Sequence, residues 1–335
     1  MLKKVEKEIS SIYFQRRADA MERSHEQALY YQDKFSELRE IEDEITRENV
    51  ALALFALKDD PLVGHQSRLE DLNKSREAIL DKHSIPWNYD QPTYQCSNCQ
   101  DTGYDRQRSD NKCLCYHELL VPILREGSNF PGLDKYIFSN FNPGLFSDIK
   151  DQERYRSDRS PRAQMLAIKA EAEKFIRNFD LIEGNGLFFI GSPGTGKTFL
   201  AGCIANELLD QGKWLVYTTS PEMFGAINEY RIIINSFNPD KIRLEKASNF
   251  YDSLMSCDLL IIDDLGTEVH NPKSQPELLQ LLNTRNARGL KSLITSNLDS
   301  MDLMNFYDER VISRIYGNFA VYSFFGDDLR LQKRG

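Results

Sequence analysis

A glycine-rich octet at residues 191–198 constrains the fold of this chain more than any other feature. It reads Gly-Ser-Pro-Gly-Thr-Gly-Lys-Thr and matches the phosphate-loop pattern, in which two glycines separated by four residues precede Lys and Ser or Thr. An apolar run, 187–190, comes before the octet, and residues 199–209 after it carry apolar side chains at helical spacing. The octet is therefore predicted to join a strand to the N-terminus of a helix, as a phosphate loop does.

The loop is predicted to hold the phosphates of ATP or GTP. Its glycines let the backbone curl until successive N–H groups face a polyphosphate, and the following helix adds positive potential there. Lys197 is expected to reach the β- and γ-phosphates, and Thr198 is expected to ligate Mg²⁺. A turn that binds nothing is the alternative, which the flanking pattern disfavours. The predicted nucleotide-binding residues are Gly191, Ser192, Pro193, Gly194, Thr195, Gly196, Lys197 and Thr198.

A second motif, the run Leu-Leu-Ile-Ile-Asp-Asp at 259–264, supports nucleotide binding. It reads as a buried strand that ends in two carboxylates, which is typical of a Walker B strand. Asp263 is expected to hold Mg²⁺ through water, and Asp264 stands where a general base or a water-positioning acid is expected. Because many related ATPases have the longer Glu at the second place, Glu268 is a reserve candidate for that role.

Four apolar segments are predicted to form the strands of one sheet, namely 187–190, 214–219, 259–263 and 291–297. Helical patterns separate them. Strands that alternate with helices form a parallel sheet that helices cover on both faces. The chain is therefore predicted to contain an α/β domain of the P-loop NTPase type.

Four of the six cysteines lie close together in the sequence, before the predicted α/β domain. They form two pairs, Cys96-x2-Cys99 and Cys113-x-Cys115, and in a reducing compartment such a cluster favours Zn²⁺ held by four thiolates over disulfides. The second pair is spaced more closely than the usual C-x2-C, so His117 is a possible substitute ligand. A redox pair or unliganded thiols are the alternatives.

The charge of the chain limits which partners its whole surface can attract. The formal net charge is −9 and the pI is near 5.3, so any contact with nucleic acid requires a local basic patch. No apolar run is long enough to span a membrane, and the N-terminus lacks the apolar core of a signal peptide. We therefore expect no membrane association and a cytoplasmic location.

The residues before the cysteines are predicted to form a helical arm. They are highly charged, contain few Gly and Pro, and show apolar residues at helical spacing, with a break expected at Asp60-Pro61. The apolar stripe either faces a core or forms a surface for a partner helix, and the pattern does not separate these interpretations. Residues 148–161 are charged and are predicted to form a mobile loop. The predicted organisation is a helical arm at 1–90, a four-cysteine zinc module at 91–120, a linker at 121–160 and an ATPase domain at 161–335.

Several motifs in the second half of the chain resemble those of one protein family. They are the phosphate loop, Ile-Ile-Asp-Asp-Leu-Gly-x-Glu at 261–268, Thr-Ser-Asn at 295–297, Glu-Arg-x-x-Ser-Arg at 309–314 and Gly-Asp-Asp-Leu-Arg at 326–330. Over residues 135–335 they resemble the DnaC/DnaI helicase loaders and their relatives, the IstB-type transposition ATPases. A helical arm followed by two cysteine pairs is similar to the loader branch.

The resemblance implies a AAA+ fold and a Mg²⁺-dependent ATPase that acts as a switch. For a loader, it implies that the N-terminal region grips the hexameric replicative DNA helicase. It also implies that the AAA+ domain binds ATP and single-stranded DNA and associates with further copies of itself. The alternative is an IstB-type ATPase that assists a transposase in selecting target DNA. A small-molecule P-loop kinase is a third possibility, which the paired aspartates disfavour.

Four further residues take roles from this resemblance. Arg310 matches the arginine finger that enters the neighbouring subunit's site, and Arg314, one helical turn further, is the next candidate for that role. Arg330 matches the sensor-2 arginine, which acts in cis, and Asn297 resembles the sensor-1 residue that helps to hold the attacking water. The alternatives are surface arginines and an asparagine that caps a turn.

Residues 220–249 are the candidate DNA-binding segment. Basic residues are interleaved there with aromatic ones, which suits single strands because bases stack on aromatic rings and phosphates attract cations. The resembling family also places a DNA-contacting helix there. The competing interpretation is a core helix, because aromatic residues at helical spacing are more often buried. The residues concerned are Arg231, Lys241, Arg243, Lys246, Phe224, Tyr230 and Phe237.

Overall fold

The chain divides into two compact units, one of residues 6–116 and the other of residues 117–335 together with the N-terminal stretch up to Val5. None of the described helices is long and apolar enough to cross a membrane. The computed structural model describes residues 2–56, 63–108, 110–181, 186–269 and 274–332.

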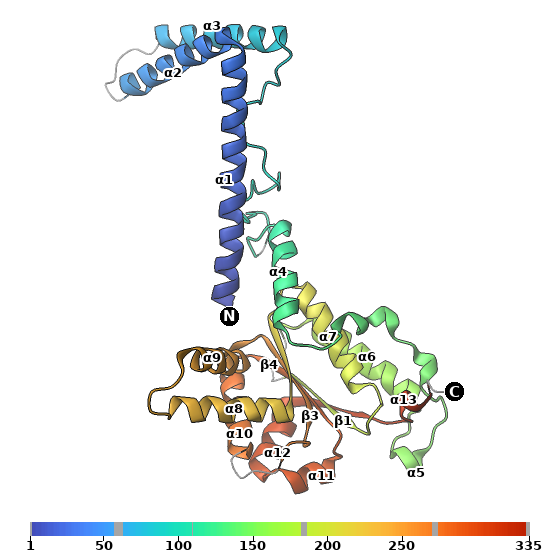
Figure 1. Ribbon diagram of the computed structural model, residues 1–335. Helices are drawn as coiled ribbons and strands as arrows, with labels where there is room; N and C mark the ends of the chain where they lie inside the picture. Colours follow the sequence, from blue (N-terminus) through green and yellow to red (C-terminus); the bar gives the residue numbers. More distant parts are fainter. Residues whose placement is uncertain (1, 57–62, 109, 182–185, 270–273, 333–335) are drawn as a thin grey trace. The chain divides into compact units, whose positions relative to one another are not determined.

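Three helices form the N-terminal part of the chain and confirm the predicted helical region (Figure 1). They are α1 (Leu2–Lys34), α2 (Ser36–Ala56) and α3 (Val63–Lys82). α2 and α3 pack against each other around a small core that contains Leu38 and Leu80. The loop that follows α3 completes this core with Ile85 and Tyr89. The expected break at Asp60-Pro61 lies outside the described residues.

The segment between the cysteines and the sheet contains more secondary structure than the predicted linker and loop. α4 (Leu114–Gly127) crosses the predicted boundary at residue 120. Within the predicted loop at 148–161, a short helix, α5 (Gln152–Tyr155), begins where the Asp151 side chain accepts a hydrogen bond from the Arg154 N–H. The loop prediction is therefore wrong for these four residues. Three short 3-10 turns stand between the two helices, η1 (Leu133–Lys135), η2 (Phe138–Asn140) and η3 (Pro143–Leu145).

A five-stranded parallel sheet forms the centre of the second unit, in the order β2-β3-β4-β1-β5. The strands are β1 (Gly186–Gly191), β2 (Leu215–Thr219), β3 (Leu259–Leu265), β4 (Lys291–Ser296) and β5 (Phe319–Phe324). The first four confirm the predicted strands. The predicted strands do not include β5. Its first four residues are apolar, but only Phe319 and Phe324 of this edge strand are buried.

Helices cover the sheet in two groups, which confirms the predicted α/β architecture (Figure 1). One group contains α6 (Pro161–Arg177) and α7 (Lys197–Asp210), which pack against each other. The helices that connect β2 to β3, β3 to β4 and β4 to β5 pack against one another as the second group. The connection from β1 to β2 runs toward one edge of the sheet, and the later connections run toward the other edge. Because such crossovers are right-handed, the two groups of helices lie on opposite faces of the sheet. The second group and the last helix are α8 (Ser220–Ile234), α9 (Lys241–Ser256), α10 (Ser274–Ala287), α11 (Ser300–Phe306), α12 (Glu309–Asn318) and α13 (Leu329–Gln332).

Candidate functional site

The phosphate loop connects β1 to α7, as its flanking sequence predicts. β1 ends at Gly191, and α7 begins at Lys197. Two of the glycines have backbone angles that favour glycine, and Gly191 is also required by space. Gly191 has φ 137°, and a Cβ there would lie 1.9 Å from the carbonyl oxygen of Phe324 in β5. Gly194 has φ 74°, and a Cβ there would lie 1.8 Å from a carboxylate oxygen of Asp328. A side chain at position 191 would clash with backbone, and the positive φ at Gly194 disfavours a side chain there.

Lys197 lies buried beneath its own loop. Its ammonium donates hydrogen bonds to the carbonyl oxygens of Gly191 (2.6 Å) and Ser192 (2.9 Å) and to Oδ1 of Asn297 (2.8 Å). Burial lowers the pKa of Lys197 to about 8, although the nearby carboxylates of Asp264 and Asp263 act in the opposite direction. Added negative charge at this point, such as a phosphate, would favour the charged ammonium.

Asp263 lies at the end of the buried part of β3, next to the first residues of α7. Thr198 Oγ1 lies 3.2 and 3.3 Å from the two carboxylate oxygens of Asp263, so the two predicted Mg²⁺ ligands meet. Hydroxyl and carboxylate oxygens form a donor set that suits Mg²⁺. Tyr217 from β2 also donates a hydrogen bond to this carboxylate (2.8 Å), and so does Thr295 from β4.

No role is predicted for Tyr217 from the sequence, and Thr295 enters the sequence analysis only as the first residue of the Thr-Ser-Asn motif. A usable signal exists, because both are polar residues near the carboxyl ends of the strands that flank β3. In a parallel sheet these ends gather at one edge, where ligands bind. Their hydroxyls fix the rotamer of Asp263, and burial, reinforced by the charge of Asp263, raises the pKa of Tyr217 so that it remains a donor.

Asn297 joins the two sides of the predicted site. Its Nδ2 donates a hydrogen bond to Asp264 Oδ1 (2.8 Å), while its Oδ1 accepts one from Lys197. Asp264 has φ 56°, a left-handed conformation that is uncommon for a residue other than glycine. Burial raises the pKa of Asp264, and the charge of Asp263 raises it further. The structure therefore brings the predicted sensor-1 residue, the phosphate-loop lysine and the second aspartate of the pair together.

A cleft of about 570 Å³ lies over the phosphate loop. Arg330 lines this cleft and forms an ion pair with Asp328 (2.8 Å). The Leu329 N–H donates a hydrogen bond to the Gly194 carbonyl oxygen (3.1 Å), which holds the C-terminal segment against the loop. The reserve candidate Glu268 is not among the lining residues. The lining residues are Tyr136, Asn140, Phe141, Asn142, Leu145, Phe146, Pro193, Gly194, Gly196, Lys197, Thr198, Phe199, Asp264, Asn297, Leu329 and Arg330.

Arg310 and Arg314 do not join this cleft. Both are exposed on α12, while Val311 and Ile315 of the same helix are buried. Neither arginine forms an ion pair with another residue in the described part of the chain. This placement is consistent with an action on a neighbouring subunit, and the choice between the two arginines stays a prediction.

The candidate DNA-binding segment divides between core and surface. Phe224 is buried, and Tyr230 stacks on Tyr251 with ring centroids 4.3 Å apart, so both serve the packing of α8 and α9. Phe237, in the connection between these helices, is fully exposed. Of the basic residues, Lys241 and Lys246 are exposed. Arg231 and Arg243 are paired with Glu277 (2.7 Å) and Glu229 (2.9 Å) respectively.

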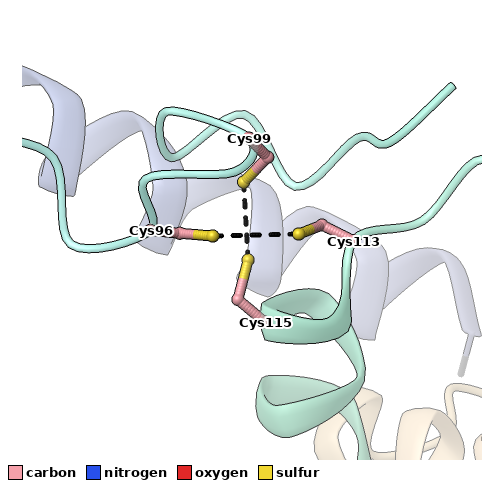
Figure 2. A group of neighbouring side chains, drawn as sticks. All are labelled: Cys96, Cys99, Cys113 and Cys115. Atoms are coloured by element: carbon pink, nitrogen blue, oxygen red, sulfur yellow. Dashed lines mark hydrogen bonds between the residues drawn. The ribbon is translucent and has the colours of Figure 1, made fainter. Parts of the chain in front are cut away.

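Four cysteine thiols converge in the first unit (Figure 2). Cys96 and Cys99 come from one turn, Cys113 directly precedes α4, and Cys115 lies in the first turn of α4. Their sulfur atoms all lie within 4.8 Å of one another. The closest pairs are Cys99 with Cys115 (3.4 Å) and Cys96 with Cys113 (3.8 Å). This cluster contains the four predicted thiols and does not include His117.

Donor groups surround the sulfurs in a way that fits metal-bound thiolates. The Gly103 N–H donates to Cys99 Sγ (3.3 Å), and Asn98 Nδ2 donates to Cys113 Sγ (3.4 Å). The Tyr13 hydroxyl lies 3.0 Å from Cys115 Sγ. The buried Asp101 accepts hydrogen bonds from the N–H groups of Gln95 and Cys96, which shapes the turn that carries the first pair. Such contacts orient ligands and stabilise their charge in metal sites.

Comparison with known proteins agrees with the geometry of the nucleotide site. Residues 162–321 match the family of bacterial DnaA ATPase domains. The chain is 29% identical over 185 residues to the replicative helicase loader DnaC of Buchnera aphidicola subsp. Schizaphis graminum, which covers 55% of this chain and 70% of that protein. The chain therefore contains a AAA+ ATPase domain that is similar to those of DnaA and of the DnaC loaders.

Two further similarities extend the comparison of the AAA+ domain. DnaC of Escherichia coli K12 is 28% identical over 186 residues, which again covers 55% of this chain and 70% of that protein. A crystal structure of the DnaC helicase loader covers 48% of this chain and 90% of that chain, with 23% identity and a TM-score of 0.40. The cleft residues from Pro193 to Asn297 lie within residues 162–321, the part of the chain that matches the ATPase domain of DnaA.

Proposed function

We propose that this protein is an ATP-dependent helicase loader that binds the replicative DNA helicase and helps to deliver it onto single-stranded DNA. The observation that carries the proposal is the similarity to DnaC loaders over 70% of their length. Residues 162–321, which match the DnaA ATPase domain, include residues that meet at one cleft, among them Lys197, Asp264 and Asn297. The proposed activity is Mg²⁺-dependent hydrolysis of ATP that switches the loader between states.

Each residue of the cleft receives a role in this proposal. Thr198 and Asp263 would hold Mg²⁺, which supplies positive charge to the phosphate oxygens when it is bound. Lys197 neutralises the β- and γ-phosphates from below the loop. Asp264 and Asn297 together orient the attacking water, because Asn297 fixes the carboxylate of Asp264 and contacts Lys197. Arg330 stabilises phosphate charge within its own subunit.

Self-association of the AAA+ domain would complete the site. The exposed position of Arg310, away from the cleft of its own subunit, supports a finger that enters the site of the next subunit. Arg314 is the second candidate for this role.

The N-terminal helices offer a surface for the helicase. Phe14, Met21 and Leu29 are exposed by 76%, 51% and 41%, and their spacing places them along one side of α1. Exposed apolar residues in a row commonly mark protein contacts. We propose that this side of α1 contacts the helicase, and that Zn²⁺ bound by Cys96, Cys99, Cys113 and Cys115 organises the neighbouring module.

The connection between α8 and α9 offers a surface for single-stranded DNA. Phe237 is fully exposed there, and the nearby Lys241 and Lys246 are exposed cations. An exposed ring next to cations suits stacking on a base with contacts to the flanking phosphates.

The test is a reconstitution with the full chain and the replicative helicase of the same organism. Wild-type protein with ATP should co-migrate with the helicase hexamer and increase the amount of helicase on closed circular single-stranded DNA. Lys197→Ala should abolish the ATP dependence, and Asp263→Ala should reduce hydrolysis more than nucleotide binding. Binding to a transposase instead of the helicase would overturn the loader assignment in favour of the IstB-type alternative.

A further inference from the structure

Glu268 is a buried carboxylate that fastens three separate segments of the AAA+ domain. It follows β3 by three residues and is 6% exposed. It accepts hydrogen bonds from Ser220 Oγ (2.6 Å), from the Gly266 N–H (2.8 Å) and from the Tyr307 hydroxyl. Ser220 and Tyr307 are themselves buried. A buried charged group with three donors is held firmly, because each lost donor leaves it partly unpaired.

The three donors come from places that matter for the proposed mechanism. Gly266 lies in the turn directly after Asp264, and this turn contains two positive φ angles, 56° at Asp264 and 96° at Gly266. Ser220 is the first residue of α8, the helix that leads to the exposed Phe237. Tyr307 ends α11 and directly precedes Asp308, the N-cap of α12. α12 is the helix that carries Arg310.

The side chain of Gln275, in α10, also holds the junction between α11 and α12. Gln275 Oε1 accepts a hydrogen bond from the Asp308 N–H (2.7 Å), and Gln275 Nε2 donates one to the Phe306 carbonyl oxygen (3.2 Å). Gln275 therefore grips the backbone on both sides of Tyr307, while Glu268 holds its hydroxyl. Burial and the charge of Glu268 raise the pKa of Tyr307, so the phenol remains protonated and acts as the donor.

We propose that Glu268 is a positioning residue that couples the Asp263–Asp264 turn to the helix bearing Arg310. A movement of this turn moves the Glu268 backbone, and the hydrogen bond to Tyr307 carries the movement to the start of α12. The bond to Ser220 carries it to α8 in the same way. A change in one subunit's cleft thereby alters how that subunit presents Arg310 to its neighbour. The inference rests on the proposed ATP hydrolysis with an arginine finger in trans.

Tyr307→Phe is the least disruptive test, because it removes one hydroxyl and leaves the ring in its packing. In the assembled, DNA-bound protein it should lower kcat for ATP hydrolysis by about tenfold while the Kd for an ATP analogue stays unchanged. Tyr322→Phe is the control, since Tyr322 in β5 also has its pKa raised by burial and by a nearby glutamate, Glu171, and does not line the cleft. It should leave kcat unchanged. A parallel loss of kcat, affinity and thermal stability in Tyr307→Phe would mean a merely structural role.

Mixed assemblies show which of the two subunits at an interface needs the Tyr307 hydroxyl for ATP hydrolysis. Lys197→Ala subunits retain Arg310 but lack a working site, and Arg310→Ala subunits retain a site but lack the finger. Their mixture should hydrolyse ATP at interfaces where an Arg310→Ala subunit supplies the site and a Lys197→Ala subunit supplies Arg310. Tyr307→Phe should reduce this activity when it is added to the Lys197→Ala subunit, which donates the finger, and not when it is added to the Arg310→Ala subunit. Equal losses in both, or no loss in either, would overturn the coupling.

A measurement without hydrolysis separates this inference from the proposed function. If wild-type protein hydrolyses no ATP, the proposed function fails while the coupling can still be examined by hydrogen exchange. Tyr307→Phe should accelerate amide exchange at residues 308–311 by about tenfold relative to wild type, and Tyr322→Phe should not. Unchanged exchange at residues 308–311 in Tyr307→Phe would overturn the coupling by itself.

Discussion

The sheet of the AAA+ domain and the four-cysteine module are held together by different means. In the sheet and the helix after the phosphate loop, residues such as Phe188 and Ile204 are completely buried, so apolar burial supplies the stability. In the described part of residues 94–116, the buried side chains are those of Cys99, Asp101, Cys113 and Tyr116. The thiols occupy the place of an apolar core. Different treatments should therefore unfold the AAA+ domain and the four-cysteine module.

Metal removal should give the largest effect, and it should be confined to the module. If the four thiolates hold Zn²⁺, purified protein should contain about one zinc per chain, and chelation should remove on the order of 10 kcal/mol of folding free energy from the module. Hydrogen exchange should show residues 94–116 unfolding while the strands of the sheet keep their protection. Cys96→Ser should lose the metal, and Cys203→Ser, at a buried cysteine of α7, should retain it.

The opposite outcome is easily recognised. A metal-free preparation in which residues 94–116 still resist proteolysis would show that side-chain packing alone holds the module. If His117→Ala loses zinc while Cys115→Ser keeps it, the ligand set contains the histidine in place of that cysteine.

A cavity in the sheet should give the next largest loss of stability, and this loss should be confined to the AAA+ domain. Phe188→Ala removes a completely buried ring from β1 and should lower the free energy of unfolding of the AAA+ domain by about 3–5 kcal/mol. Zinc content should not change. Denaturant unfolding followed by segment-resolved hydrogen exchange measures both quantities. A loss of zinc in Phe188→Ala would show that the two regions do not fold independently.

The same contrast explains how much of the molecule can be predicted from the sequence. Buried parallel strands read as continuous apolar runs, so 259–263 predicts β3, and a phosphate loop after an apolar run predicts β1 and α7. The edge strand β5 is absent from the prediction although it begins with four apolar residues, and only Phe319 and Phe324 of it are buried.

The functional residues divide in a similar way. Local motifs identify Lys197 and Asp263, because the chemistry of a phosphate loop or a Walker B strand fixes residue types at close spacing. The supporting residues Tyr217 and Glu268 act through contacts with residues about 40 or more positions away, namely Tyr217 with Asp263 and Glu268 with Ser220. Only the three-dimensional arrangement of the strands and helices reveals such pairs.

Nucleotide binding should stabilise the AAA+ domain and leave the stability of the four-cysteine module unchanged. With ATP and Mg²⁺ at 100 times the Kd, the AAA+ domain should gain about 2.7 kcal/mol, because the ligand binds only the folded state. Lys197→Ala should abolish this gain, since no other ammonium in the described cleft contacts the loop carbonyls of Gly191 and Ser192. Thermal unfolding with and without nucleotide measures the shift. An unchanged ATP-induced shift in Lys197→Ala would refute the assignment of the phosphate-loop lysine.

The smallest expected effect concerns Tyr13, which connects α1 to the four-cysteine module. Its hydroxyl lies 3.0 Å from Cys115 Sγ, and its ring lies so close to Gly103 that a Cβ there would come within 2.6 Å of it. Tyr13→Phe keeps the ring and removes one hydrogen bond to a thiolate. It should therefore cost about 1 kcal/mol and accelerate zinc release to a chelator by about tenfold or less. Tyr30→Phe is the control on the same helix, because Tyr30 is exposed and is not part of the cluster. ATP binding should be identical in both variants, since neither residue belongs to the AAA+ unit. If Tyr13→Phe releases zinc at the wild-type rate, the hydroxyl does not support the thiolate, and the contact between Tyr13 and the module is one of packing alone.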